Sequence, residues 1–224
     1  MSDPDLIRIS GDSSMGEQQS FQIENGGSIP TSPLQFFVCP IGHLRCSEFV
    51  ETWHYSRRMP TGKNINFGAF IDEILYAVIV LGIGVNPYQA KFLGVENTME
   101  IKRLCRIEPK SDKYPLSKLI SVAIKMARKA YKFDAVVAFA DPEQSHHGGI
   151  YKASGFEFKG TTNAEWHTVD RGGNKRHRRY VFRYARRANI TVEEARNALG
   201  LKRIKTEPKN RWVRYLILHY RENK

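Results

Sequence analysis

The sequence is poor in cysteine, with only Cys39, Cys46 and Cys105 among its 224 residues. Three scattered thiols do not make a disulfide framework, so they indicate a reducing, cytosolic setting. No stretch approaches the roughly 18 consecutive apolar residues of a membrane-spanning helix. The opening residues, MSDPDLIRIS, lack the basic and apolar segments of a secretion signal. We therefore expect a protein that stays in the cytoplasm and does not enter a membrane.

Acidic residues become scarce toward the end of the chain. The formal net charge is +12 overall, but residues 1–33 hold five acidic residues against one basic residue, a net charge of −4. Their composition is typical of a flexible acidic arm. From residue 171 onward, seventeen Lys or Arg stand against four Glu, a net charge of +13. This basic part favours a polyanion such as nucleic acid as the partner, although a solvated basic surface has the same composition.

Apolar periodicity predicts a mixed α/β fold, with a single domain over residues 34–224 whose part from about 171 is a basic extension. The expected elements are strand 34–38, helix 41–54, hairpin strands 66–69 and 74–81, strand 99–107, helix 116–132 and strand 133–140. The last three elements, in the order strand, helix and strand, indicate a parallel crossover. Such a crossover forms a crevice where ligands bind.

The stretch 133–160 carries the strongest local signals of a site. Its apolar run ends at Asp141, and because Pro142 cannot continue a strand, the carboxylate is expected at the carboxyl end of a central strand. A turn at 146–149, a short helix that stops at Gly155, and a strand ended by Gly160 complete the stretch. The simpler interpretation of Asp141 is that it only begins a turn.

The elements after Gly160 are predicted from weaker patterns. They are a strand within 161–167, a basic loop over 170–179, an edge strand over 180–184, a helix from 190 to Gly200 and a closing strand over 211–220. Thr191 followed by Glu194 is the pattern of a capping box at the start of that helix.

Several separated motifs resemble those of a known family. The helix and strand YKASGF (151–156) resembles the closing motif of the Gcn5-related N-acetyltransferase fold. The motifs WHYS (53–56), EIKRL (100–104), LSKLIS (116–121) and AD (140–141) with HGGIY (147–151) follow one another in the order of the Mom proteins, phage enzymes related to these acetyltransferases. The resemblance covers residues 34–184 and implies a Gcn5-related N-acetyltransferase-like fold.

The resemblance to Mom proteins also implies an activity. The expected enzyme is a transferase that converts adenine in duplex DNA to N6-(carbamoylmethyl)adenine and so protects phage DNA from restriction in the host cytoplasm. Catalytic roles carry over to Asp141, Tyr151, His54 and Tyr55. A carboxylate that accepts a hydrogen from the adenine amine raises its nucleophilicity, and a histidine has a suitable pKa for proton transfer.

The donor of the transferred group is expected at Arg103 and Ser117, two further positions of the resemblance. Ser117 lies in the first turn of a helix, where backbone N–H groups point toward an anion. Acetyl-CoA is the donor of the wider fold, but the loop 108–116 lacks the glycines that let backbone approach a pyrophosphate. Glycyl-tRNA is therefore the alternative donor, with tRNA as a further partner.

A metal is left open by the resemblance, with His54 as a ligand of iron. The spacing of Cys39, His43, Cys46 and His54 fits no standard zinc pattern. Phosphate contacts with DNA are expected from the basic residues Arg171, Lys175, Arg176, Arg178, Arg179, Arg183, Arg186 and Arg187. Two other functions fit the same fold: an ordinary N-acetyltransferase acting on a protein or small amine, and a DNA-binding phage protein without catalysis.

Overall fold

The computed structural model describes residues 36–84, 86–107, 115–164, 166–176 and 178–216. The acidic arm (1–33) and most of the loop without glycine (108–114) lie outside these ranges. The chain divides into two compact units. The first comprises residues 1–138, 153–156 and 213–224, and the second comprises 139–152 and 157–212.

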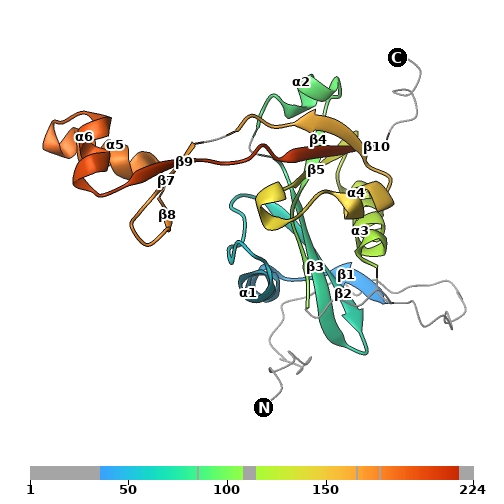
Figure 1. Cartoon of the computed structure of the whole chain (residues 1–224). Helices are drawn as coiled ribbons and strands as arrows, with labels where there is room; N and C mark the ends of the chain where they lie inside the picture. The colour runs from blue at the N-terminus through green and yellow to red at the C-terminus, as the bar shows by residue number, and fades with distance from the viewer. Residues whose placement is uncertain (1–35, 85, 108–114, 165, 177, 217–224) are drawn as a thin grey trace, which may run out of the picture. The chain divides into compact units, whose positions relative to one another are not determined.

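The first unit is built on a sheet that begins with an antiparallel meander (Figure 1). Strands β1 (Phe37–Pro40), β2 (Asn64–Ile71), β3 (Ile74–Gly82) and β4 (Thr98–Arg106) pair antiparallel in this order. Strand β5 (Ala135–Ala140) then pairs parallel with β4. Beyond β5 the strand order continues with β10 (Asn210–Tyr215), whose residues from Val213 onward belong to this unit. The mixed α/β class predicted from the sequence is confirmed.

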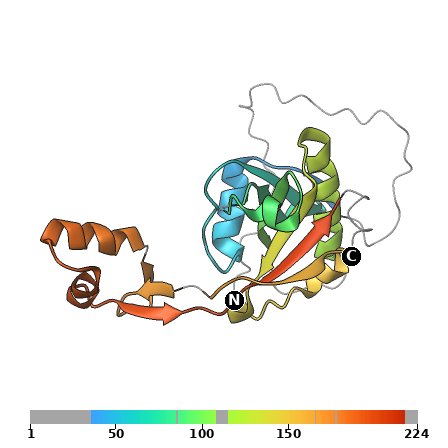
Figure 2. The same cartoon turned by 90° about the horizontal axis from the view of Figure 1, so that it is seen from above.

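Helices α1 (His43–Trp53) and α3 (Leu116–Ala130) cover opposite faces of the sheet of the first unit (Figures 1 and 2). In α1, Phe49 and Val50 are buried against Val78 and Val80 of β3. The buried residues of α3 recur at helical spacing and are Leu119, Ile120, Ala123, Ile124 and Ala127. A short helix, α2 (Gln89–Leu93), which the sequence did not predict, precedes β4. Within the described ranges, no helix is long and apolar enough to cross a membrane.

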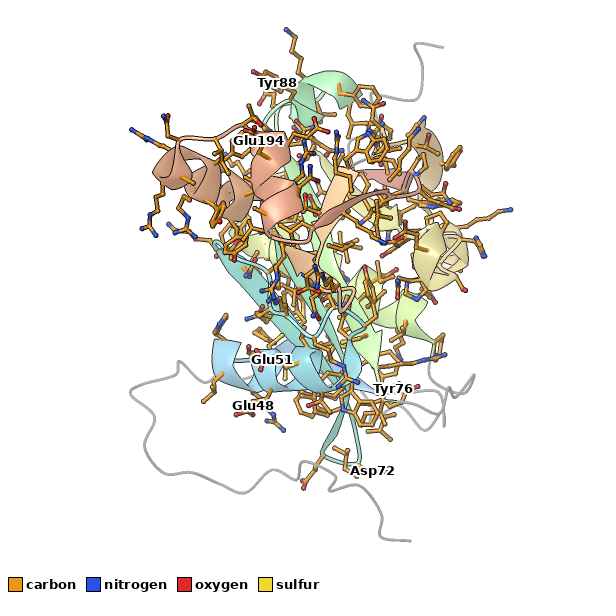
Figure 3. The ribbon with its side chains drawn as sticks, turned by 60° about the vertical axis from the view of Figure 1, so that its left-hand side comes forward. Glu48, Glu51, Asp72, Tyr76, Tyr88 and Glu194 are labelled. Atoms are coloured by element: carbon orange, nitrogen blue, oxygen red, sulfur yellow. The ribbon has the colours of Figure 1, made fainter. Side chains whose placement is uncertain are left out.

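The hairpin of β2 and β3 has the turn that the sequence predicts. Asp72 and Glu73 have φ angles of 47° and 67°, and Asp72 lies at the tip of the hairpin (Figure 3). Non-glycine residues tolerate this left-handed region poorly, with Asp among the better exceptions. The turn therefore fixes the register that buries five successive residues of β2 and eight of β3.

Two cysteines of the first unit are buried deeply enough to raise the pKa of their thiols. Burial raises the pKa of the Cys46 thiol to about 12. Burial, together with the neighbouring Cys46, also raises the pKa of Cys105 to about 12, although Arg103 lowers it in part. The pKa of Cys39, which is partly exposed, is raised as well, because burial outweighs the nearby Arg45.

These thiols should therefore differ in reactivity. Because only the thiolate reacts, Cys46 and Cys105 should stay unmodified by iodoacetamide at pH 8 in the folded protein, while Cys39 is modified first. Raising the pH should not make Cys46 and Cys105 reactive until the pH approaches their raised pKa or the protein unfolds. Peptide mass spectrometry before and after unfolding in urea measures this order, and equal labelling of all three in the folded protein would contradict it.

The second unit begins where β5 ends. It contains the 3₁₀ turn η1 (Pro142–Gln144), most of α4 (Gly149–Ala153) and strand β6 (Glu157–Thr161). A small sheet follows in the order β8 (Lys175–Arg176), β7 (Trp166–Val169) and β9 (Lys202–Lys205). Helices α5 (Arg178–Ala188) and α6 (Val192–Ala198) pack on each other through Val181, Ala185 and Ala195, and Leu201 belongs to the same buried cluster. The predicted capping box is present, with Thr191 and Glu194 bonded reciprocally.

Several predictions for the second unit are wrong. Residues 180–184 form part of helix α5 rather than an edge strand, because the buried residues Val181 and Ala185 are four apart. The strand expected within 161–167 begins only at Trp166, and β6 continues past Gly160 to Thr161. The expected basic loop is a turn over 170–174 followed by β8 and α5, and β9 was not predicted. The closing strand is β10, and residues 217–220 lie outside the described ranges.

Candidate functional site

Asp141 lies directly after β5, where the sequence predicted it, and its side chain caps the turn η1. Its Oδ1 accepts a hydrogen bond from the backbone N–H of Glu143 at 3.2 Å. The backbone carbonyl of Asp141 accepts from the N–H groups of Gln144 and His146. The turn therefore fixes both the backbone and one carboxylate oxygen of Asp141.

A second segment of the same unit, residues 207–209, contacts this turn. The Nζ of Lys209 is 3.3 Å from Oδ2 of Asp141, and the two side chains are 46% and 13% exposed. The backbone of Lys209 is itself fixed, because its N–H donates to Oγ1 of Thr162 and its carbonyl accepts from the N–H of Thr162. Close by in sequence, the N–H of Glu207 donates to Oε1 of Glu143. Asp141 is thus a mostly buried carboxylate with a cation beside it.

Tyr151 lies on α4, ten residues after Asp141, and is 9% exposed. The start of this helix depends on Gly148, which has a φ of +86° and lies directly under the indole of Trp212. Trp212 packs edge-on against Phe158, with ring centroids 5.7 Å apart. The segment 207–212 therefore contacts both ends of the stretch that carries Asp141 and Tyr151.

His54 belongs to the first unit and ends helix α1 as its C-cap, with a side chain that is only 7% exposed. Its Nδ1 accepts a hydrogen bond from the backbone N–H of Ser56 at 3.0 Å and lies 2.8 Å from Ser56 Oγ. Because a backbone N–H can only donate, the neutral ring carries its proton on Nε2. In this tautomer Nε2 carries a hydrogen that His54 can donate.

The structure brings Arg103 to the loop that carries His54 and Tyr55. The Nε of Arg103 donates to the carbonyl of Arg58 at 3.0 Å, and Nη1 donates to the carbonyl of Lys102 at 2.6 Å. Tyr55 is 48% exposed, and its ring centroid is 4.3 Å from that of His54. Ser117 is partly buried in the first turn of α3, as predicted.

The arrangement around His54 does not favour a metal ion. A metal-ligating histidine usually donates its other ring N–H to an acceptor, whereas Nδ1 of His54 itself accepts from Ser56. Among the residues that the structure describes, no group of three or more His, Cys, Asp or Glu is placed to hold a metal ion.

The predicted DNA-binding residues occupy different settings in the second unit. Arg176 forms an ion pair with Asp170, with Nη2 and Oδ2 2.7 Å apart. Hydrogen bonds from the backbone and side chain of Asn174 and from the side chain of Arg176 lower the pKa of Asp170. The side chain of Arg171 lies against Gly200. Arg179 and Arg183 are exposed on α5, and the side chains of Lys175 and Arg178 lie outside the described part of the structure.

Sequence reasoning missed Lys209 and Trp212 as neighbours of the candidate site. Both lie more than 60 residues from Asp141 and Gly148 in the sequence, and neither belongs to a recognisable motif. The signal that was present is local: Gly148 and Gly149 follow two histidines, and a glycine at positive φ often marks a close approach of another group. That signal indicates a contact at Gly148 but does not identify the partner.

Comparisons with known proteins agree with the motifs. The chain is similar to a methylcarbamoylase, mom, of Escherichia phage Mu, with 28% identity over 189 residues that cover 71% of this chain and 77% of the relative. Similar solved structures include a Bacillus subtilis acetyltransferase in complex with CoA (13% identity, 82% and 100% of the two chains) and an IAA acetyltransferase from Bacillus cereus (14%, 81% and 100%), each with a TM-score of 0.47. The model of the Mom protein family matches residues 35–224. The chain therefore belongs to the Mom protein family.

Proposed function

We propose that this protein is a transferase that modifies the exocyclic amine of adenine in duplex DNA, giving N6-(carbamoylmethyl)adenine and protecting phage DNA from host restriction. The observation that carries the proposal is Asp141, a mostly buried carboxylate at the end of β5 that is oriented by Glu143 N–H and Lys209. Membership of the Mom family and the name of the Mu relative, methylcarbamoylase, support the choice of reaction.

The proposed reaction requires a hydrogen-bond acceptor beside the exocyclic amine of adenine. The lone pair of the adenine amine is delocalised into the ring, so the amine is a poor nucleophile until a hydrogen bond acceptor draws on one of its hydrogens. Each carboxylate oxygen accepts more than one hydrogen bond, so the contacts with Glu143 and Lys209 leave Asp141 able to accept another. Because the amine of a stacked base is shielded, the adenine must leave the helix before it reacts.

Two donors are proposed, and the atoms of the product distinguish them. Transfer from acetyl-CoA would give an N-acetyl group, and reaching the carbamoylmethyl product from its two carbons would need a separate nitrogen donor and an oxidant. Attack of the amine on a glycyl ester of tRNA forms a new N–C bond, releases the tRNA hydroxyl and gives N6-glycyladenine. This adduct is an isomer of N6-(carbamoylmethyl)adenine, so rearrangement alone completes the product. In this proposal Arg103 and Ser117 bind the donor, while Tyr151 contacts the base or protonates the leaving group.

Mass spectrometry of nucleosides tests the proposed function. DNA from cells that express the protein should contain an adenosine in which a carbamoylmethyl group replaces one amine hydrogen. DNA from cells without the protein should lack it, and its absence in both would sink the proposal. Purified protein incubated with plasmid and isotope-labelled glycyl-tRNA then separates the donors, because only the tRNA route places the label in the nucleoside.

Lys209 should contribute to this activity by positioning Asp141. Replacing Lys209 with Met removes the cation beside Oδ2 and should lower the turnover rate about tenfold, since a partly exposed ion pair contributes only modestly. The Michaelis constant for DNA should change little, and Lys209→Arg should restore most of the activity. Steady-state kinetics with plasmid DNA measures this. Lys205→Met, which removes an exposed lysine on β9, is the matched control, and an equal loss in both variants would rule out a specific role.

A further inference from the structure

Helix α5 presents an exposed face that is rich in arginine. Five of its eleven residues are arginine and none is acidic. Val181 and Ala185 pack toward α6 and are buried. At about 100° per residue, Arg179, Arg183 and Arg186 lie on the side opposite these two residues. Tyr180 and Phe182 lie on the two flanks of this arginine ridge and are 44% and 52% exposed.

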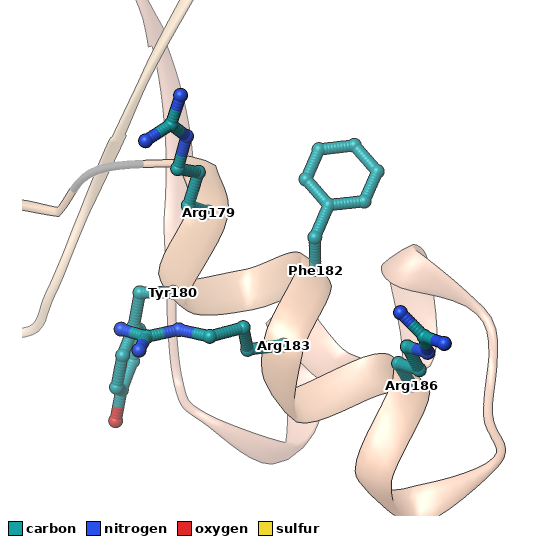
Figure 4. A pocket seen from close by; sticks show the side chains of 5 residues that line it. All are labelled: Arg179, Tyr180, Phe182, Arg183 and Arg186. Atoms are coloured by element: carbon teal, nitrogen blue, oxygen red, sulfur yellow. The ribbon is translucent and has the colours of Figure 1, made fainter.

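These five residues line one open depression of about 570 Å³ (Figure 4). Phe182 and Tyr180 project to different sides of the helix. Exposing the apolar rings of Tyr180 and Phe182 to water costs free energy. Together with the arginines, these rings present positive charge and stacking surface side by side. This combination is typical of surfaces that bind nucleic acid through phosphates and bases.

The arginines of α5 differ in how their charge interacts with the helix dipole. Arg186 and Arg187 lie in the last turn, where positive charge stabilises the negative end of the helix dipole. Arg179 lies in the first turn, where no acidic residue accompanies it and where positive charge is unfavourable. A phosphate at this end would interact favourably with both the arginine and the exposed N–H groups of the helix.

The dimensions favour duplex DNA over RNA. Arg179 and Arg186 are seven residues apart, about 10 Å along the helix axis, and duplex DNA carries one charge per about 1.7 Å of its axis. An α-helix with its side chains is about 10–12 Å wide, which matches the roughly 12 Å major groove of B-form DNA. The major groove of A-form RNA is too deep and narrow for side chains to enter.

We propose that the exposed face of α5 is the surface on which this protein binds double-stranded DNA, with Arg179, Arg183 and Arg186 on the phosphates and Phe182 against a base that has lost its stacking partner. The inference rests on the proposed function, because it assigns the substrate of that reaction to a surface. The proposed surface does not include Arg176, whose charge is paired with Asp170. Tyr180 and Phe182 were not predicted as part of this surface, because the sequence prediction placed them on a strand.

Binding measurements with a charge-matched control test the inference. The variant Arg179→Gln, Arg183→Gln, Arg186→Gln keeps good helix formers in α5 and removes three charges. The control, Lys125→Gln, Lys129→Gln, Lys132→Gln, removes three charges from exposed lysines on and directly after α3. Fluorescence anisotropy with a labelled duplex should show about a 100-fold loss of affinity in the α5 variant near physiological salt. The slope of log affinity against log salt concentration should be less negative by about 2–3 in the α5 variant than in the wild-type protein.

A second variant addresses the aromatic flank. Phe182→Ala should weaken binding to a duplex with one unpaired base about tenfold, because base stacking on an aromatic ring is lost, and should change binding to a fully paired duplex about twofold or less. Circular dichroism should show unchanged helix content in each variant. An equal effect of Phe182→Ala on both duplexes would overturn the assignment of Phe182 to an unstacked base.

Three outcomes would overturn the assignment of DNA to α5. These are equal losses in the α5 and lysine variants, unchanged duplex affinity in the α5 variant, and loss of tRNA binding with duplex binding intact. Failure of the inference is distinguishable from failure of the proposed function. If the wild-type protein makes the modified nucleoside while the α5 variant binds DNA normally, only the inference falls. If DNA binding depends on α5 but no modified nucleoside is ever made, only the proposed function falls.

Discussion

Replacing Asp141 with asparagine should lower formation of the modified nucleoside by about 100- to 10,000-fold, the range that a positioned acid or base contributes to proton transfer. The amide oxygen of the introduced asparagine can still accept the hydrogen bond from Glu143 N–H, so the turn η1 keeps its cap. What the variant loses is the negative charge that draws on the adenine amine. Mass spectrometry of plasmid nucleosides after reaction with purified protein measures the loss.

The neighbouring carboxylate provides a control for this variant. Glu143 lies in the same turn, and its Oε1 accepts from the N–H of Glu207. Glu143→Gln makes the same change in charge and keeps an oxygen that can accept this bond, so it should retain most of the activity. Asp141→Asn should also bind duplex DNA with wild-type affinity. If Asp141→Asn, with its fold intact, keeps more than about a tenth of the wild-type activity, Asp141 is not the acceptor that general-base catalysis requires.

Most elements that position the candidate site could be predicted because their signals are local. The apolar run of β5 and the proline after it place Asp141, and the spacing of apolar residues in α3 places Ser117 in its first turn. The capping box of Thr191 and Glu194 needs only four residues and is present as predicted. In each case neighbouring residues specify the structure, so distant parts of the chain add little information.

Helix α5 could not be predicted because two periodicities compete in the same residues. Tyr180, Phe182 and Tyr184 alternate as the residues of a strand do, and aromatic residues favour strands. In the structure these three side chains are exposed, and the buried positions are Val181 and Ala185. The helical pattern therefore has only two apolar anchors, whereas the misleading strand pattern has three larger ones. The contact with α6 decides between them, and that contact is not visible in the local sequence.

The pairing of Lys209 with Asp141 could not be predicted from the sequence, for a different reason. Lys209 is one of many basic residues in a part of the chain with a net charge of +13, and nothing in its neighbourhood distinguishes it. The backbone of Lys209 is held by hydrogen bonds with the hydroxyl and the N–H of Thr162, and the N–H of Glu207 donates to Glu143 in the turn at Asp141. Sequence reasoning can therefore identify the acid of the candidate site, but only the fold identifies its partner.

Gly148 should be among the least replaceable positions of the second unit. Its φ of +86° is unfavourable for any residue with a side chain, and a Cβ there would overlap the indole ring of Trp212. Gly148→Ala should therefore lower the free energy of unfolding by about 2–4 kcal/mol through backbone strain and overpacking. That is a large part of the stability of a typical domain. Thermal and urea unfolding, followed by circular dichroism, measures the change.

Gly149 is the matched control, because it adjoins Gly148, has no positive φ, and nothing lies within 4 Å of a Cβ added there. Gly149→Ala should leave the stability unchanged or raise it by up to about 1 kcal/mol, since alanine favours the helix α4. Trp212→Leu in the Gly148→Ala background should recover the part of the loss that comes from the overlap, because the two changes interact only where they touch. The part that comes from the positive φ should remain. Equal stabilities of Gly148→Ala and Gly149→Ala would contradict the packing of Trp212 over Gly148, and with it the contact that holds segment 207–212 against the start of α4.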